Sequence, residues 1–196
     1  MMEISAEQRK EYIVLISIDL IHENGIDHVS TKEIAKRLNI SEALIFKYFS
    51  KKSEIFKAVL DLFVRYDKDL FATANFKNEN ILEDMMLSFN ILLRYYENYP
   101  AITSIYQAYY SFHNEPELKA LVTEIFMKRS MYIRQLIEKA QEKHWITQNY
   151  NSEMIADILS STIRGMCLKW RMKDYSFSLR DETLQVIKVL LASFTA

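Results

Sequence analysis

Glycine and proline are scarce in this chain of 196 residues, which contains only two of each. Gly-rich phosphate loops and tight hairpin turns depend on these residues, so their scarcity argues against both and favours long helices. Apolar residues make up 49% of the chain, which is ample for a packed core and argues against wholesale disorder. These proportions predict an all-α protein.

Cysteine and long apolar runs are equally sparse. Cys167 is the only cysteine, so the chain has no internal disulfide, and nothing indicates an oxidising compartment. No run approaches the ~18 uninterrupted apolar residues of a membrane span, and the first residues lack the apolar core of a signal peptide. We therefore expect a soluble, cytoplasmic protein without a membrane partner.

The motifs of catalysis are also missing. The chain contains no Glu-x-x-His, no His-Glu-x-x-His and no Gly-rich nucleotide loop. The four histidines are scattered, and Cys167 lies on a predicted apolar helix, where a cysteine is more often a small buried hydrophobe than a nucleophile. We therefore predict no enzymatic activity, no cofactor and no metal site.

Charge is balanced overall but not locally. The formal net charge is −1, yet residues 30–60 carry seven basic and three acidic side chains, a net charge of +4. A basic segment of this kind suits a polyanionic partner, although it also suits a solvated helix face. Charge by itself leaves both readings open.

Apolar spacing, caps and breakers divide the chain into about nine helices, and two regions follow from them. The predicted helices cover residues 5–24, about 31–38, 41–49, 52–74, 80–98, 101–112, 116–143, 152–172 and 179–194. Residues 1–50 form a three-helix head, and residues 51–196 form a helical-bundle body, with the helix from about residue 52 linking the two. The expected architecture is all-α.

Within the head, two short helices are separated by a tight turn. Ser30 or Thr31 caps the first, Ser41 caps the second, and Asn39 between them tolerates positive φ. Short helices do not persist alone, so apolar side chains must pack them against the first helix. Two such helices make a helix-turn-helix unit, whose second helix can present its outer face to the major groove of DNA. The alternative is a helical hairpin in an ordinary bundle, in which Lys47 and Tyr48 are merely solvated.

The stretch "STKEIAKRL", followed by "ISEALIFKYFSKKSEIF", resembles the DNA-binding head of the TetR-type (tetracycline-repressor-like) transcriptional regulators. The shared features are the opening threonine, an Ile-Ala pair, an Ile-Ser start, spaced aromatics and a Ser-Lys-acid opening of the fourth helix. The match spans roughly residues 8–62. The resemblance implies DNA contacts from Thr31, Ser41, Glu42, Ala43, Phe46, Lys47, Tyr48 and Lys52.

Three residues depart from the family pattern. Asn39 stands where a turn glycine is usual, and Ala43 adds a methyl group where glycine often allows close backbone approach. Glu42 is acidic where many relatives are neutral or basic, so it can accept a hydrogen bond from a cytosine amino group but repels a phosphate. The operator sequence therefore does not follow from these residues.

The body is expected to dimerise and to bind an effector. The helices near 152–172 and 179–194 are amphipathic, and the resemblance implies a homodimer through them, which would read a palindromic operator on double-stranded DNA. The middle of the chain is rich in tyrosine, which suits a pocket for an apolar or amphipathic effector. The candidate pocket residues are Tyr96, Tyr106, Tyr110 and Trp170.

The sequence thus predicts a ligand-responsive, DNA-binding transcriptional regulator, with release of a repressor by a small lipophilic effector as the leading mechanism. Two alternatives stay open: a transcriptional activator of the same fold, and a helical protein-interaction module that does not bind DNA. Binding to a DNA duplex that weakens with salt would separate the regulators from the interaction module.

Overall fold

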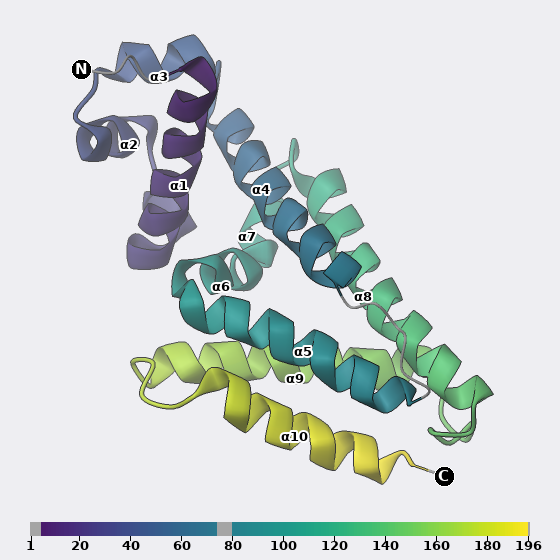
Figure 1. The fold of residues 1–196 in the computed structure, drawn as a ribbon. Helices are drawn as coiled ribbons and strands as arrows, with labels where there is room; N and C mark the ends of the chain where they lie inside the picture. Colours follow the sequence, from purple (N-terminus) through teal and green to yellow (C-terminus); the bar gives the residue numbers. More distant parts are fainter. Residues whose placement is uncertain (1–4, 74–79, 196) are drawn as a thin grey trace. The chain divides into compact units, whose positions relative to one another are not determined.

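The computed structural model describes residues 5–73 and 80–195, and side chains within 5–65 and 80–195 (Figure 1). These residues form ten α-helices and one 3-10 helix, with no β-strand among them, so the predicted all-α class is confirmed. The helices are α1 (Ala6–Asn24), η1 (Ile26–His28), α2 (Thr31–Leu38), α3 (Glu42–Tyr48), α4 (Lys52–Thr73), α5 (Ile81–Asn98), α6 (Pro100–Gln107), α7 (Tyr109–Asn114), α8 (Lys119–Glu142), α9 (Ser152–Met172) and α10 (Leu179–Ser193).

The chain divides into two compact units. Unit 1 contains Met1–Tyr66 and Ala101–Thr123, and unit 2 contains Asp67–Pro100 and Glu124–Ala196. Unit 1 therefore includes the whole predicted head together with α6, α7 and the first turn of α8. Two helices, α4 and α8, begin in unit 1 and continue into unit 2. The functional division into a head and a body near residue 50 stays a prediction.

The head is held by side-chain caps at the helix starts and by one apolar core between its helices. Ser5 caps α1 in a capping box with Gln8, Ser30 caps α2 and Ser41 caps α3, as the sequence predicts. Asn39 has φ 53° and ψ 47°, the left-handed conformation that the tight turn requires. Ile34 and Ile45 are fully buried where α1, α2 and α3 pack on one another.

One predicted helix is wrong. Residues 101–112 were expected as one helix with Tyr106 and Tyr110 on a shared face, but the helix is interrupted at Ala108, whose ψ is 3°. The side chain of Tyr106 is buried, whereas that of Tyr110 is 78% exposed. Neither glycine nor proline marks this interruption, so the local sequence gave no signal for it.

Other helix ends differ by a few residues, as pattern-based boundaries usually do. The helix expected from Pro116 begins at Lys119, and Pro116 lies in the turn before it. The predicted end of the fourth helix, near Ala74, lies outside the described residues. The predicted start of α9 at Ser152 and of α10 at Leu179 are both confirmed.

In unit 2, α10 packs against both α5 and α9 (Figure 1). The buried faces follow helical spacing, with Leu159 and Ile163 on α9 and Ile187 and Leu191 on α10. At the start of α10, Glu97 of α5 accepts hydrogen bonds from the Ser178 hydroxyl (2.9 Å) and the Arg180 amide (3.3 Å). A buried apolar layer and a polar contact at the helix start thus join α5 to α10.

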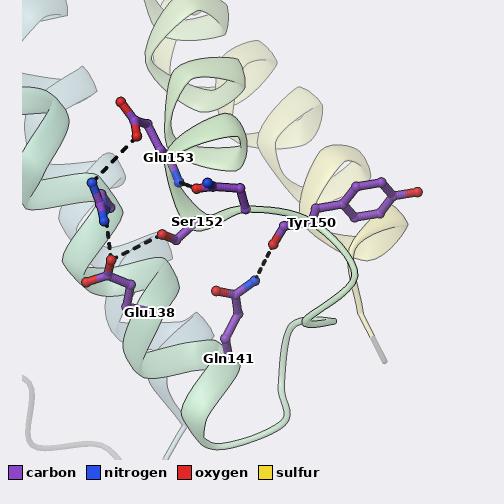
Figure 2. A network of polar contacts seen from close by, with 7 residues as sticks. Glu138, Gln141, Tyr150, Ser152 and Glu153 are labelled. Carbon is purple, nitrogen blue, oxygen red and sulfur yellow. Dashed lines mark hydrogen bonds and ion pairs between the residues drawn. The ribbon is translucent and has the colours of Figure 1, made fainter.

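The connector between α8 and α9 is ordered by polar side chains (Figure 2). Gln141 donates to the carbonyl oxygens of Thr147 (2.9 Å) and Tyr150 (2.8 Å). Glu138 accepts from the Ser152 hydroxyl (3.1 Å) and from Arg134 Nε (2.8 Å). This connector was expected to be polar, and these hydrogen bonds give the backbone carbonyls of a loop the partners that they need.

Cys167 is completely buried on α9, and burial raises the pKa of its thiol to about 12. Because the thiolate is the reactive form, alkylation by iodoacetamide at pH 8 should be roughly 10³-fold slower in the folded chain than in denaturant. Mass spectrometry over time measures both rates. Equal rates in the two conditions would contradict this burial.

None of the helices among the described residues is long and apolar enough to cross a membrane.

Candidate nucleic-acid interface

Helix α3 has one buried and one exposed face. Ile45 is fully buried and Phe49, directly after the helix, is 7% exposed, so these two side chains fix α3 to the head. Four of the predicted DNA contacts, Glu42, Ala43, Phe46 and Lys47, are exposed to solvent, and Tyr48 is half-buried. Phe46 is 48% exposed, which is unusual for so large an apolar side chain. The helix therefore offers a free, chemically mixed face.

The first turns of α2 and α3 lie together, because the Thr31 hydroxyl donates to a carboxylate oxygen of Glu42. Each residue is the first of its helix, so the carboxylate lies where two helix dipoles have their positive ends. A DNA phosphate favours the same position, so it would compete with Glu42. The sequence did not predict this contact, which joins residues eleven positions apart.

The α3–α4 junction, residues 49–53, connects the predicted recognition helix to α4. Glu54 accepts hydrogen bonds from the backbone amide (2.7 Å) and the hydroxyl (2.9 Å) of Ser50. These bonds, the backbone one above all, hold the pKa of the Glu54 carboxyl below its usual value. Glu54 is therefore ionised at neutral pH and fixes the turn that follows α3.

Lys52 points toward the interior of unit 1. Its Nζ donates to the Val29 carbonyl oxygen (3.3 Å) and lies 5.0 Å from the centre of the Phe56 ring. The side chain is half-buried rather than extended into solvent. A contact between Lys52 and a phosphate would therefore replace its bond to Val29.

A second acid contacts this junction from a distant part of the chain. Glu117, in the connector between α7 and α8, accepts from Lys51 Nζ at 2.5 Å and from the Ser53 hydroxyl. Sequence analysis missed this residue because no local pattern links positions more than sixty residues apart.

The structure does not bring the four candidate pocket residues together in one unit. Tyr106 and Tyr110 belong to unit 1, and Tyr96 and Trp170 belong to unit 2. Tyr96 is fully buried, and its hydroxyl accepts from Arg129 Nη2 at 3.0 Å. The Trp170 indole donates to the Phe177 carbonyl oxygen (2.9 Å) and packs edge-on against Tyr175, which orders the connector before α10.

Two observations bear on chemistry other than DNA binding. The described residues contain no group of three or more His, Cys, Asp or Glu side chains placed to hold a metal ion. His22, at the end of α1, lies 2.9 Å from the Ser104 hydroxyl of α6, so its ring joins two helices of unit 1. The His22 side chain is half-buried.

Residues 16–59 match the sequence family "Bacterial regulatory proteins, tetR family". These residues contain the end of α1, all of α2 and α3, and the beginning of α4, which is the exposed helix-turn-helix described above. The head of this chain is therefore similar to the regulators of that family. The resemblance seen in the sequence of the head is thereby confirmed.

Known proteins are similar to this chain beyond its head. The nucleoid occlusion factor SlmA of Haemophilus influenzae is 21% identical over 173 residues, which cover 85% of this chain and 77% of SlmA. The ketosteroid regulator KstR2 of Mycobacterium tuberculosis superposes with a TM-score of 0.81 at 14% identity, over 99% of this chain and 100% of KstR2.

A third similar protein was solved with a ligand. The regulator FadR of Bacillus subtilis, in complex with stearoyl-CoA, superposes with a TM-score of 0.79 at 16% identity, over 92% of this chain and 97% of FadR. At these identities the solved structures establish a common fold for the head and the helices that follow it.

Proposed function

We propose that this protein is a dimeric transcriptional repressor that leaves its operator when a small lipophilic effector binds. The observation that carries the proposal is the free face of α3, where Phe46 and Lys47 are exposed while Ile45 beneath them is fully buried. A helix fixed by its core and free on its outer face fits a major groove of similar width. The other predicted contacts are Thr31, Ser41, Glu42, Ala43, Tyr48 and Lys52.

The DNA-binding step is tested with a random pool of duplexes. The chain should enrich a palindromic sequence with half-sites about one helical turn apart, and its affinity should fall steeply between 50 and 200 mM salt. Enrichment of no duplex at low salt would contradict the proposal and favour the helical interaction module.

Lys52 is expected to contact a phosphate in the complex, so Lys52→Ala should weaken binding to every duplex and make the salt dependence shallower by roughly 1 unit per subunit. Lys57→Ala is the matched control, because Lys57 lies on the same helix, is exposed and is not among the predicted contacts. A salt titration of both variants gives the slopes. An unchanged slope for Lys52→Ala would remove this residue from the interface.

The class of effector is inferred from buried aromatic side chains and from similar proteins. Tyr96 and Trp170 are buried aromatic side chains of unit 2, and Tyr106 is buried in unit 1. FadR of Bacillus subtilis, a protein of the same fold, binds stearoyl-CoA. We therefore propose an amphipathic effector with a long apolar part, which would lower operator affinity by binding a conformation unfit for DNA.

The effector proposal has a direct assay. Stearoyl-CoA and free stearate, each below its micelle concentration, should release the enriched duplex in a fluorescence anisotropy titration, and dodecyl sulfate at equal concentration serves as the detergent control. Release by dodecyl sulfate alone, or by neither acyl ligand, would contradict an acyl effector.

Dimerisation through α9 and α10 is proposed from the exposed apolar side chains that these helices carry. Met154, Leu168 and Met172 on α9 are 49%, 45% and 72% exposed, and Val189 on α10 is 71% exposed. Gly165 lies in the same exposed stripe, and a Cβ added to it would meet no atom within 4 Å. Packing within the protomer therefore does not require glycine at position 165. A glycine on an exposed helix face lets the backbone of a second copy approach closely.

Nucleoid occlusion is the second candidate, because SlmA is similar over most of this chain. A factor of that kind would bind many chromosomal sites instead of one promoter, and it would need no small effector. Mapping the bound sites across the genome separates the two. A few sites upstream of genes whose transcripts rise on deletion support the repressor, and dispersed sites without transcript changes support the occlusion factor.

A further inference from the structure

Glu117 is the one described acid that contacts the α3–α4 junction from outside the head sequence. The carboxylate accepts from Lys51 Nζ at 2.5 Å and from the Ser53 hydroxyl. Lys51 immediately precedes α4, and Ser53 lies in its first turn. Both donors are therefore within four residues of Phe49, the buried side chain that ends α3.

The carboxylate is fixed in place because its own connector is anchored. The next residue, Leu118, is 1% exposed, and its amide donates to the Glu115 carbonyl oxygen (2.9 Å). On the other side, Phe112 of α7 is fully buried and packs edge-on against Phe56 of α4, with ring centres 5.5 Å apart. Residues 112–118 thus make both apolar and polar contacts with the start of α4.

Electrostatics keeps Glu117 charged. Hydrogen bonds from Lys51, and next from Ser53, hold the pKa of the Glu117 carboxyl below its usual value, so it is an anion at neutral pH. The side chains of Lys51 and Glu117 are 53% and 52% exposed, and exposed pairs of this kind add little to overall stability. The contact between Glu117 and Lys51 therefore contributes more to the position of the α3–α4 junction than to the stability of the fold.

We infer that Glu117 is a positioning residue for DNA binding, which sets the angle at which α3 leaves α4. Helix α8 begins two residues after Glu117, is 24 residues long and continues into unit 2. A shift of α8 along its axis would therefore move Glu117 and, through Lys51 and Ser53, the start of α4. This inference rests on the proposed function, in which α3 is the helix that reads DNA.

The first test uses the full chain without DNA. Glu117→Gln keeps the shape of the side chain but removes its charge, so amide hydrogen exchange at residues 50–54 should become about tenfold faster. Exchange in α2 and the melting temperature should stay unchanged, because the lost pair is exposed. Glu142→Gln is the control, since it removes the same charge from an exposed position at the end of α8.

The second test compares the duplex that the wild-type chain enriches with a scrambled duplex. Glu117→Gln should bind the enriched duplex about fivefold more weakly and the scrambled duplex no more weakly, so the specificity ratio falls. Lys51→Met should lower the ratio similarly, and the double variant should be no worse than either single one. Glu117→Asp should restore part of the ratio, because the charge returns.

The outcomes are distinct. Unchanged exchange at residues 50–54 would overturn the inference whatever happens on DNA, and so would additive effects of the two substitutions. Faster exchange in a chain whose wild type enriches no duplex would support the contact of Glu117 with the junction and contradict the proposed function instead. Faster exchange with an unchanged specificity ratio would reduce Glu117 to a merely structural role and overturn the inference.

Discussion

Replacing Gly165 with tryptophan is expected to convert the proposed dimer into a folded monomer. Gly165 lies in the middle of α9, is exposed, and has open space where a side chain would begin. A glycine in a helix interior costs about 1 kcal/mol relative to alanine, so the isolated protomer would be more stable without it. The side chain of tryptophan would separate two closely packed helices and leave the protomer itself undisturbed.

The consequence for DNA should be large. Two linked heads on two half-sites bind about 10²-fold or more tightly than one head, so affinity for the palindrome should fall by at least that factor. Sedimentation equilibrium gives the mass and circular dichroism the helix content. Gln135→Trp on the exposed surface of α8 is the matched control. A Gly165→Trp protein that sediments as a dimer would contradict this interface.

Ile45→Ala is expected to abolish DNA binding by unfolding the recognition helix. Ile45 is 0% exposed and is the buried residue of α3, whose seven residues cannot persist as an isolated helix. Truncation of a buried isoleucine to alanine costs about 2–5 kcal/mol, a large part of the stability of an ordinary domain. The head should therefore open while unit 2 keeps its structure.

The neighbouring residue provides the control. Phe46 is larger but 48% exposed, so Phe46→Ala should change stability by only about 0.5 kcal/mol and act on DNA affinity alone. Hydrogen exchange localises the effect: Ile45→Ala should expose the amides of α2 and α3, whereas Phe46→Ala should leave them protected. Equal protection in both variants, with DNA binding intact, would show that Ile45 is not required to fix α3.

The head was predictable because its determinants are close together in sequence. Ser30, Ser41 and Asn39 act through hydrogen bonds and backbone conformations that span three or four residues, and the structure has each of them as expected. Ile34 and Ile45 were expected to face α1, and both are fully buried. The seventeen-residue stretch from Ile40 also carried the family resemblance that the comparison with known families confirmed.

The orientation of the aromatic side chains was not predictable in the same way. Helical spacing places Tyr106 and Tyr110 on one face, but the helix is interrupted at Ala108, and Tyr106 is buried whereas Tyr110 is exposed. Trp170 stays a predicted pocket residue, and its indole donates to the Phe177 carbonyl oxygen in the connector before α10, a contact that the sequence did not indicate. Composition indicates how many aromatic residues a chain has, but tertiary packing decides which of them face a ligand.

By itself, the sequence determined the all-α class, the capped helices and the helix-turn-helix, because these depend on caps and apolar periodicity within a few residues. Only the tertiary structure decided that Glu117 reaches Lys51, that Glu42 accepts from Thr31, and that α6 and α7 belong to the unit of the head. Such contacts join residues far apart along the chain, and their energies depend on distances that exist only after folding.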